Sequence, residues 1–261
     1  MKYACFAKLR DMDMVSKLGF DGAELDMNEI RALSKPETKK LRERLTELNL
    51  EPCSCSWLLP NSVHICDKGF DRDAWLRQFD PDGEKLAMLG CKTVVFASGP
   101  IRTVGNDGET PGKKEIINDF ILKTAKVFKR HGVRVALETV CFDYTDYLTY
   151  LHESAEICRL PEAENIYLLS DIRHLVRAGD EPDDICRFAD RIIHAHIDNP
   201  ITIQRIMPLP GDGYRYELFL RRILQTRTEW LSYETADEGD MMKNGPVSLR
   251  YIQSLVEKLS V

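Results

Sequence analysis

The chain has 261 residues, of which 43% are hydrophobic and 30% charged, proportions typical of a soluble globular protein and unlike those of a disordered chain. Its 36 basic and 42 acidic residues give a formal net charge of -6, so it lacks the positive surface that nucleic-acid binders and polybasic membrane binders need. No apolar run approaches the ~18 residues of a membrane span, and the N-terminal segment becomes charged too early for a secretory signal. We therefore expect a cytoplasmic protein whose partner is neither a nucleic acid nor a membrane.

The eight cysteines are scattered along the chain. In a reducing compartment, cysteines in such a pattern act as buried small hydrophobic residues rather than as disulfide partners. Cys53 and Cys55 form a CxC pair, but no second pair lies at the spacing of a zinc finger. The pattern therefore predicts free, mostly buried thiols.

Short apolar runs alternate with amphipathic stretches from one end of the chain to the other. The apolar runs, which we predict to be strands, are residues 3–7, 22–25, 51–57, 93–97, 133–137, 166–170, 192–197 and 230–233. Most of these runs are nearly continuous, which is typical of strands that are buried on both faces of a parallel sheet. The amphipathic stretches, which we predict to be helices, are residues 39–48, 74–89, 116–131, 147–159, 181–189, 216–224 and 247–259.

Eight strand-then-helix units in a chain of this length match the period of a (β/α)8 barrel. The competing architecture, a doubly wound open sheet, normally has a glycine-rich turn after an early strand. Here the first predicted strand is followed by KLRDMD, which contains no glycine. The predicted fold class is therefore α/β, a (β/α)8 TIM barrel that forms a single domain over residues 1–261.

The last four predicted strands all end at a potential metal ligand. These ligands are Glu138, Asp171, His196 and Glu234. Taken singly, each residue also fits a helix cap, a solvated loop or a hydrogen-bonded core position, but the ends of barrel strands converge on one rim. Three carboxylates that meet there raise one another's pKa unless a cation compensates their charge. The set predicts a divalent metal, with Mn²⁺ favoured and Mg²⁺, Co²⁺ and Zn²⁺ as alternatives.

These residues carry a resemblance to a known family. The series Glu138, Asp171 to His174 (DIRH), His194 to His196 (HAH) and Glu234 resembles the xylose isomerase-like superfamily, within it the sugar phosphate isomerase/epimerase branch with its ketose 3-epimerases and inosose-converting enzymes. The segment QRIMPLPGDG also resembles an arginine-containing loop of that family. The resemblance covers nearly the whole chain. It implies that Glu138, Asp171, His196 and Glu234 hold the metal, and that His174 and Arg205 bind substrate oxygens.

The resemblance implies a divalent-metal-dependent isomerase or epimerase of a small sugar or polyol ketone. In that chemistry the metal holds the carbonyl oxygen, and a carboxylate removes the neighbouring proton to form a cis-enediolate. Glu138 and Glu234 are the candidates for proton transfer. Two carboxylates on two faces of the substrate permit epimerisation, whereas one carboxylate that carries a proton between carbons gives isomerisation.

Three other functions compete with this one. A dehydratase of an inosose-like polyol begins with the same proton loss and stays open as the alternative. An apurinic-site endonuclease needs three zinc ions and extra histidines, but the second predicted strand ends near Glu24, and the chain is acidic. A non-catalytic sugar-binding barrel has no need of opposed carboxylates at a metal. Members of the family are often dimers or tetramers, so a homo-oligomer is compatible with the resemblance.

Substrate specificity is the least determined property of the sequence. Ketose epimerases carry a glutamate shortly after the ligand of the fifth strand, where this chain offers only Asp143. Trp57 is a candidate for stacking on a sugar ring, although a core position fits it equally well. The acidic loop at residues 236–243 favours an unphosphorylated substrate. Lys8, Arg10 and Arg102 are the cations that a phosphate could meet from other loops.

Overall fold

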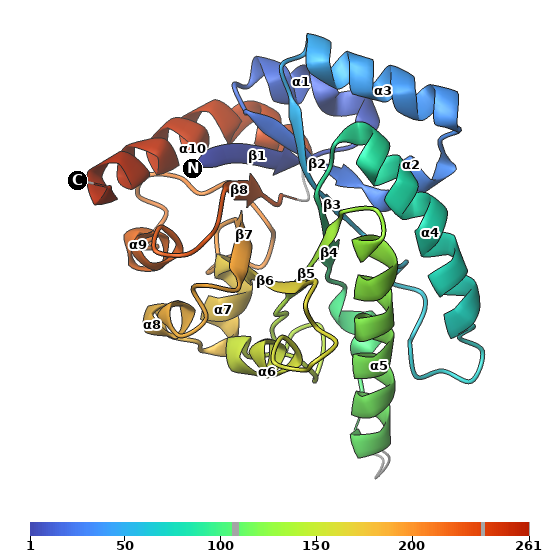
Figure 1. The fold of residues 1–261 in the computed structure, drawn as a ribbon. Coiled ribbons are helices and arrows are strands. Elements are labelled where there is room, and N and C mark those ends of the chain that lie inside the picture. The colour runs from blue at the N-terminus through green and yellow to red at the C-terminus, as the bar shows by residue number, and fades with distance from the viewer. Residues whose placement is uncertain (106–109, 236–237, 261) are drawn as a thin grey trace.

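Eight parallel strands form a closed barrel in the computed structural model, which describes residues 1–105, 110–235 and 238–260 (Figure 1). The strands are β1 (Lys2–Phe6), β2 (Gly22–Asp26), β3 (Glu51–Ser56), β4 (Thr93–Phe96), β5 (Arg134–Glu138), β6 (Ile166–Asp171), β7 (Ile192–Ile197) and β8 (Trp230–Tyr233). Each strand pairs with the next one in sequence, and β1 closes the barrel against β8. The predicted (β/α)8 fold is confirmed.

The helices surround this barrel (Figure 1). They are α1 (Met12–Lys17), α2 (Met27–Ala32), α3 (Lys35–Glu47), α4 (Arg72–Leu89), α5 (Thr110–Lys129), α6 (Leu151–Ile157), α7 (Ile172–Ala178), α8 (Pro182–Cys186), α9 (Glu217–Ile223) and α10 (Glu238–Leu259). Two short 3₁₀ helices, η1 (Leu9–Asp11) and η2 (Gly99–Arg102), follow β1 and β4. None of the helices among the described residues combines the length and apolar character that crossing a membrane requires.

The predicted strands all agree with the structure to within one residue at either end. The helices agree less well, because α1, α2 and α7 have only six or seven residues and show too little periodicity to be predicted. Helix α10 begins at Glu238 rather than at residue 247, since it continues through Pro246. The carbonyl that loses its hydrogen bond to this proline belongs to Met242, whose side chain is exposed, and we expect water to satisfy it.

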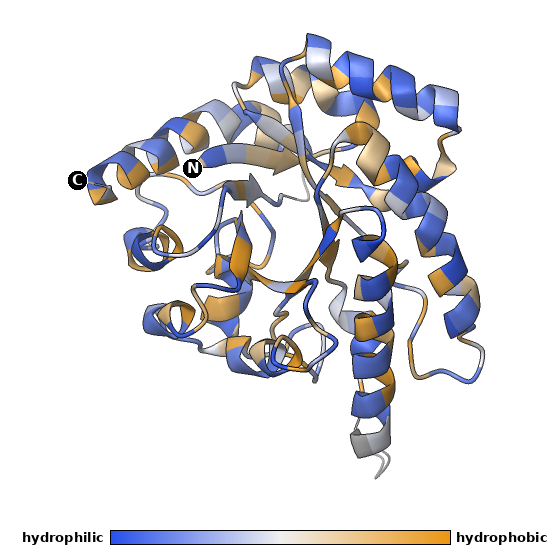
Figure 2. Ribbon diagram, viewed as in Figure 1, coloured by the Kyte–Doolittle hydropathy of each residue, from blue (hydrophilic) through white to orange (hydrophobic). Residues whose placement is uncertain are grey.

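The main hydrophobic core lies between the barrel and its helices. The ring of Phe120 on α5 contacts the ring of Phe79 on α4 and that of Phe96 on β4, with centroids 6.0 and 6.3 Å apart. In Figure 2 the helices mix hydrophilic and hydrophobic residues along their length, whereas β5 and β7 are largely hydrophobic. Burial of these apolar faces holds the strands in register and fixes where each strand ends.

The cysteines are free, as predicted. Cys5, Cys53, Cys55, Cys91, Cys141 and Cys158 are buried, and Cys66 is partly so, while only Cys186 is exposed. Burial raises the pKa of the Cys5, Cys53 and Cys55 thiols. These groups therefore behave as packed apolar side chains rather than as thiolate ligands or nucleophiles.

Candidate metal centre

The four predicted ligands come together at the mouth of the barrel. Glu138 and Asp171 end β5 and β6, His196 lies near the end of β7, and Glu234 follows β8. One ligand atom from each residue lies within 4.8 Å of one from every other. Glu138, Asp171 and His196 are buried, and the Glu234 side chain is 19% exposed towards the cavity. The convergence expected from the barrel geometry is therefore observed.

The donor atoms fit a single divalent ion. His196 Nδ1 lies 3.2 Å from Glu138 Oε1 and 3.2 Å from Glu234 Oε2. Neighbouring ligands of an octahedral ion with bonds of ~2.1 Å are about 3 Å apart, so this spacing suits atoms that share one cation. Three carboxylates and one imidazole form a set that Mn²⁺, Mg²⁺, Co²⁺ and Zn²⁺ all accept.

Asp171 both caps helix α7 and belongs to the cluster of predicted ligands. Its Oδ1 accepts hydrogen bonds from the backbone N–H groups of Arg173 (2.7 Å) and His174 (3.2 Å), so it caps the N-terminus of α7. Its Oδ2 points towards the cluster and lies 3.3 Å from Arg205 Nη1. The helix cap and the ligand role considered for this residue are therefore compatible, because each uses a different oxygen.

The second nitrogen of His196 contacts a buried carboxylate that the sequence pattern did not place in the site. His196 Nε2 lies 3.0 Å from Glu24 Oε2, and His194 Nε2 lies 3.1 Å from the same oxygen. Ser54 donates to this oxygen at 2.9 Å, and Ser56 donates to Oε1. The register of β2 against β3 shifts between Ala23 and Glu24, where the strand turns Glu24 into the barrel. Glu24 therefore lies fully buried in the barrel, beneath the four predicted ligands.

His194 lies beneath the site rather than in it. Its ring is buried beside that of His196, with ring centroids 5.2 Å apart, and it does not line the main cavity. Glu24, His194 and His196 also satisfy the spacing of a metal cluster. The Nε2 atoms of both histidines instead point at the same oxygen, Oε2 of Glu24, which also accepts a hydrogen bond from the Ser54 hydroxyl. This is the geometry of hydrogen bonding to a single acceptor.

The charges of the cluster shift the pKa of its members. Burial raises the pKa of Glu138 to about 7, and the charges of Glu234 and Asp171 add to this effect against that of His196. Burial would raise the pKa of Glu234 as well, but Arg205 and His196 outweigh it and lower that pKa. Burial also opposes the charged form of His196, yet Glu24, Glu138 and Glu234 raise the pKa of His196 well above its usual value.

Arg205 lies directly over the carboxylates. Its Nη1 lies 2.7 Å from Glu234 Oε2 and 3.2 Å from Asp198 Oδ2, and its Nη2 lies 2.7 Å from His174 Nε2. Because an arginine only donates hydrogen bonds, His174 Nε2 is the acceptor in this contact. His174 Nδ1 lies 3.3 Å from the sulfur and 3.4 Å from the backbone nitrogen of Cys141. Burial lowers the pKa of His174 to about 4, so its imidazole is neutral at pH 7.

A buried arginine that the sequence pattern did not single out holds the loop carrying Arg205. The guanidinium of Arg173 donates to the carbonyl oxygens of Asn199 (2.7 Å), Thr202 (2.8 Å) and Ile203 (2.7 Å). It is fully buried. The segment between His196 and Arg205 is therefore an ordered arch that returns Arg205 to the carboxylate–imidazole cluster.

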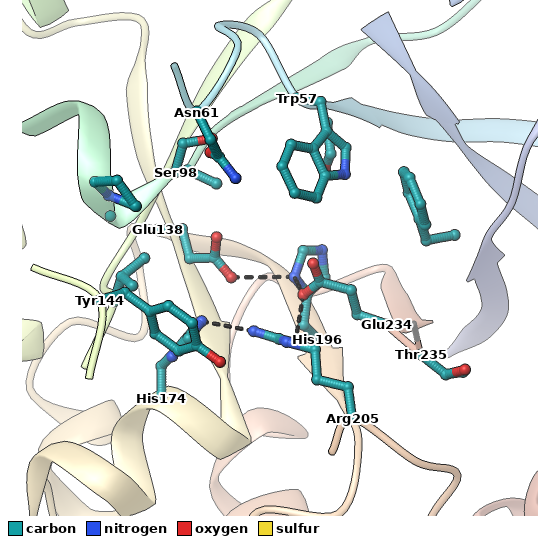
Figure 3. Close-up of a pocket in the computed structure, with 16 residues that line it drawn as sticks. Trp57, Asn61, Ser98, Glu138, Tyr144, His174, His196, Arg205, Glu234 and Thr235 are labelled. Carbon is teal, nitrogen blue, oxygen red and sulfur yellow. Dashed lines mark hydrogen bonds and ion pairs between the residues drawn. The ribbon is translucent and has the colours of Figure 1, made fainter. Parts of the chain in front are cut away.

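The cluster opens into a cavity of about 260 Å³ (Figure 3). Figure 3 shows Glu138 and Glu234 reaching His196 from opposite sides, with Trp57 facing them across the cavity and Tyr144 beside His174. The Tyr144 ring meets His174 edge to face, with centroids 5.6 Å apart. Trp57 lines this space and, among the described residues, belongs to none of the core clusters, so its core interpretation is wrong, while stacking on a sugar ring stays a prediction.

Several residues considered from the sequence lie elsewhere. Asp143 pairs with Arg177 and does not line the cavity, so it does not replace the epimerase glutamate. Arg102 is fully buried and donates to the carbonyl oxygen of Glu138 at 2.8 Å, which removes it as a phosphate ligand. Arg10 pairs with Glu238 at the surface. Of the acidic loop at 236–243, residues 236 and 237 lie outside the described residues.

The fold and the site define an α/β barrel protein with a carboxylate–imidazole cluster at the carboxyl ends of its strands. Residues 12–255 match the sequence model of the xylose isomerase-like TIM barrel family. The chain belongs to this family, which confirms the resemblance drawn from its motifs. No curated protein matches the sequence of the chain.

Solved structures share the fold at low sequence identity. The 3-keto-D-glucoside 4-epimerase YcjR from E. coli has a TM-score of 0.79 and 19% identity, with 97% of this chain and 99% of that chain covered. A D-psicose 3-epimerase solved in the presence of D-fructose has a TM-score of 0.79 and 16% identity, with 98% and 99% covered. The IolI protein with a bound zinc atom has a TM-score of 0.73 and 18% identity, with 100% and 97% covered.

Proposed function

We propose that the chain is a divalent-metal-dependent isomerase or epimerase of a sugar or polyol ketone. The observation that carries the proposal is the convergence of Glu138, Asp171, His196 and Glu234 beside a cavity at the mouth of the barrel. A divalent ion held by these four residues would supply Lewis acidity to the carbonyl group of a substrate. Similar structures bear the names of sugar epimerases, and one contains zinc, which supports this class of reaction.

Glu138 and Glu234 are the proton-transfer residues of this proposal. Both carboxylates contact Nδ1 of His196, and in Figure 3 Glu138 approaches it from the left and Glu234 from the right. In this proposal the substrate binds between them, with one carboxylate near each face. Burial and the neighbouring carboxylates raise the pKa of Glu138 to about 7 in the metal-free cluster, and a bound divalent cation lowers it again, which leaves Glu138 as the carboxylate that removes a proton. Removal by one carboxylate and return by the other inverts the carbon next to the ketone.

Arg205 and His174 take the role of stabilising the developing negative charge. Both line the cavity, and the Arg205 guanidinium stays charged because the pKa of Arg205 is raised, with Glu234 and Asp171 overcoming the effect of burial. An enediolate oxygen next to this guanidinium receives charged hydrogen bonds, in a setting where little water competes. Neutral His174 accepts a hydrogen bond from Arg205 through Nε2, which holds the guanidinium in place without adding charge.

Proton exchange in D₂O tests the proposal directly. We expect the Mn²⁺-loaded protein to incorporate deuterium next to the ketone of at least one substrate in a panel of ketohexoses, keto-glycosides and inososes, followed by NMR. Glu138→Gln and Glu234→Gln should each lower exchange by at least 100-fold. Glu164→Gln, which alters a carboxylate on the outer surface paired with Lys129, is the matched control.

Three outcomes separate the alternatives. Exchange with return of a new stereoisomer or ketose supports the proposal, whereas exchange with loss of water assigns the chain to the polyol dehydratases. Absence of exchange across the panel, in protein shown by elemental analysis to carry one Mn²⁺, contradicts both. Exchange that persists undiminished in the two glutamine variants contradicts the roles given to these carboxylates.

A further inference from the structure

A second cavity lies beside the metal centre and shares part of its wall. It has a volume of about 370 Å³, and three residues, Phe6, Trp57 and Thr235, line both spaces. The remaining residues around it come from the segment after β1, from the end of β2 and the start of α2, and from α10: Ala7, Lys8, Asp11, Asp26, Asn28, Glu238 and Met241. None of these seven takes part in the metal cluster or the proton transfer described above. The second cavity is therefore additional to the site of reaction.

Two aromatic rings form the boundary between the cavities. The centroids of Phe6 and Trp57 are 6.5 Å apart, and both side chains are only partly buried. Within the described part of the chain, neither ring packs into a hydrophobic core cluster. Trp57 has a φ of 61°, a left-handed backbone that is rare for a bulky residue and is maintained mainly at functional sites. The fold thus presents apolar surface to the cavities instead of burying it.

The polar groups of the second cavity are matched in charge. Lys8 pairs with Asp26, whose other oxygen accepts hydrogen bonds from the backbone and the side chain of Asn28. Arg10 pairs with both Asp11 and Glu238. Among the residues described here, Lys8 is the one cation that lines this space, and a carboxylate already neutralises it. Such a surface offers hydrogen bonds to hydroxyl groups but no excess positive charge to a phosphate.

The volumes of the two cavities also favour a substrate that occupies both. Ligand pockets typically enclose ~300–1,000 Å³, so the reaction cavity by itself, at about 260 Å³, is small. The two cavities together fall within that range. A substrate that reaches from one to the other must pass the aromatic boundary, where the C–H face of a sugar ring can pack against Trp57 or Phe6.

We propose that the second cavity is a subsite for a neutral sugar ring, and that the substrate is a glycoside whose reacting keto sugar is joined to that ring. The reacting ring lies over the metal centre, the linkage passes Phe6 and Trp57, and the hydroxyls of the second ring bind Lys8, Asp26 and Asn28. The naming of a glycoside as substrate rests on the function proposed above. The subsite itself rests only on the shape and chemistry of the second cavity.

Binding of unreactive disaccharides tests the subsite without turnover. The probes are methyl β-cellobioside, methyl β-maltoside and methyl β-isomaltoside, which contain no carbonyl group, with methyl β-D-glucoside as the single-ring reference. Isothermal titration of the full chain should give at least tenfold tighter binding for one or more disaccharides than for the reference. Equal affinity for all four probes overturns the proposal.

Two substitutions locate the effect. The double variant Lys8→Met, Asn28→Ala should lose the tenfold preference, while Lys129→Met, a lysine on the outer surface paired with Glu164, should keep it. Trp57→Leu tests the aromatic boundary and should also lower the affinity for disaccharides. If the preference survives in the double variant, the second ring lies elsewhere and the proposal is wrong.

Two further experiments complete the test. The first distinguishes a sugar ring from an aromatic group as the occupant of the subsite, and the second distinguishes binding of the substrate from its reaction. The aryl glycoside 4-nitrophenyl β-D-glucoside tests for an aromatic occupant. If it binds more tightly than every disaccharide, and if its affinity is unchanged in the double variant, the assignment of the subsite to a sugar ring is overturned. Deuterium exchange on a keto-disaccharide and on a free ketose reports on the reaction. Disaccharide binding without exchange refutes the proposed function and keeps the subsite, whereas exchange with equal kcat/KM for both substrates refutes the subsite and keeps the function.

Discussion

His196 Nε2 lies 3.0 Å from Oε2 of Glu24, a carboxylate to which solvent has no access. Because the carboxylate of Glu24 accepts a hydrogen bond from Nε2–H, the lone pair of a neutral imidazole lies on Nδ1, the nitrogen that faces Glu138 and Glu234. Burial alone would raise the pKa of Glu24, but His196 and His194 overcome it and hold that pKa well below its usual value. Glu24 therefore fixes both the orientation and the tautomer of the proposed ligand.

Replacement of Glu24 should weaken metal binding without removing a ligand. We expect Glu24→Gln to raise the Kd for Mn²⁺ by ~10–100-fold, the usual effect of losing a partner of a metal-bound histidine. Ser56→Ala is the matched control, since it removes another hydrogen bond to Glu24 but keeps the contact with His196. Titration followed by the EPR signal of free Mn²⁺ measures both. Unchanged affinity in a folded Glu24→Gln protein would contradict this role.

Arg205 should weaken the binding of the metal but increase the rate of the reaction. Its guanidinium lies between Asp171 and Glu234, so it contributes positive charge where the cation binds. We expect Arg205→Met to bind Mn²⁺ about tenfold more tightly, ~1.4 kcal/mol, yet to lower kcat by at least tenfold. Arg177→Met, whose partner Asp143 lies outside the cavity, should change neither value. Weaker metal binding in Arg205→Met is the result that would refute the electrostatic argument.

Arg173 should control the order of the loop that carries Arg205. Arg173→Met removes a donor from three carbonyl oxygens, that of Asn199 being buried, which we expect to lower the free energy of unfolding by about 1–3 kcal/mol. Hydrogen exchange should increase first in residues 199–205. Arg173→Lys keeps the charge but cannot reach all three oxygens, so an intermediate effect is expected. Uniform exchange over the whole chain in both variants would instead indicate a purely global role.

Asp180 should make stability depend on pH. Burial raises its pKa to about 6, with Asp184 and Glu153 adding to the effect, while an aspartate of the unfolded chain titrates near ~3.9. The unfolded state therefore loses its proton first, and the free energy of unfolding falls between about pH 4 and pH 6 by at most ~3 kcal/mol. Asp180→Asn can still accept from the Leu151 N–H and should raise Tm at pH 7.5 but not at pH 4.

The control for this prediction is Asp190→Asn, since the Asp190 side chain is 81% exposed and its neutralisation should leave Tm nearly unchanged at both pH values. If Asp180→Asn shifts Tm equally at pH 4 and pH 7.5, a change in packing rather than in charge is responsible. Thermal unfolding followed by circular dichroism gives both values.

The strands and the ligands at their ends were predictable because they follow from local patterns. A strand such as β7 is continuously apolar apart from its two histidines. Because the carboxyl ends of barrel strands meet at one rim, the residues at these ends, Glu138, Asp171, His196 and Glu234, were expected to lie together. Glu24 was recognised only as the end of a strand, because its partners His194 and His196 lie 170 and 172 residues away. Only the closure of the barrel brings them into contact.

Other features depend on tertiary structure in the same way. Arg173 reads as an ordinary helical arginine in the sequence, and its burial results from the way in which the segment 199–203 folds back over it. Helix α7 has seven residues, too few to show an amphipathic period, although Asp171 is a recognisable cap. The second cavity required the relative placement of β1, β2 and α10, which no local pattern specifies.

The barrel divides its tasks between two arcs. The proposed ligands come from β5 to β8, whereas the aromatic boundary and most polar groups of the second cavity follow β1, β2 and β3. Provided that Glu24 and its contact with His196 are kept, the segments that follow β1, β2 and β3 can therefore change without disturbing the atoms that react. A lineage with this architecture can exchange one substrate for another by altering a few surface segments, and directed evolution of new specificity should begin with residues 6–11, 26–28 and 57–61.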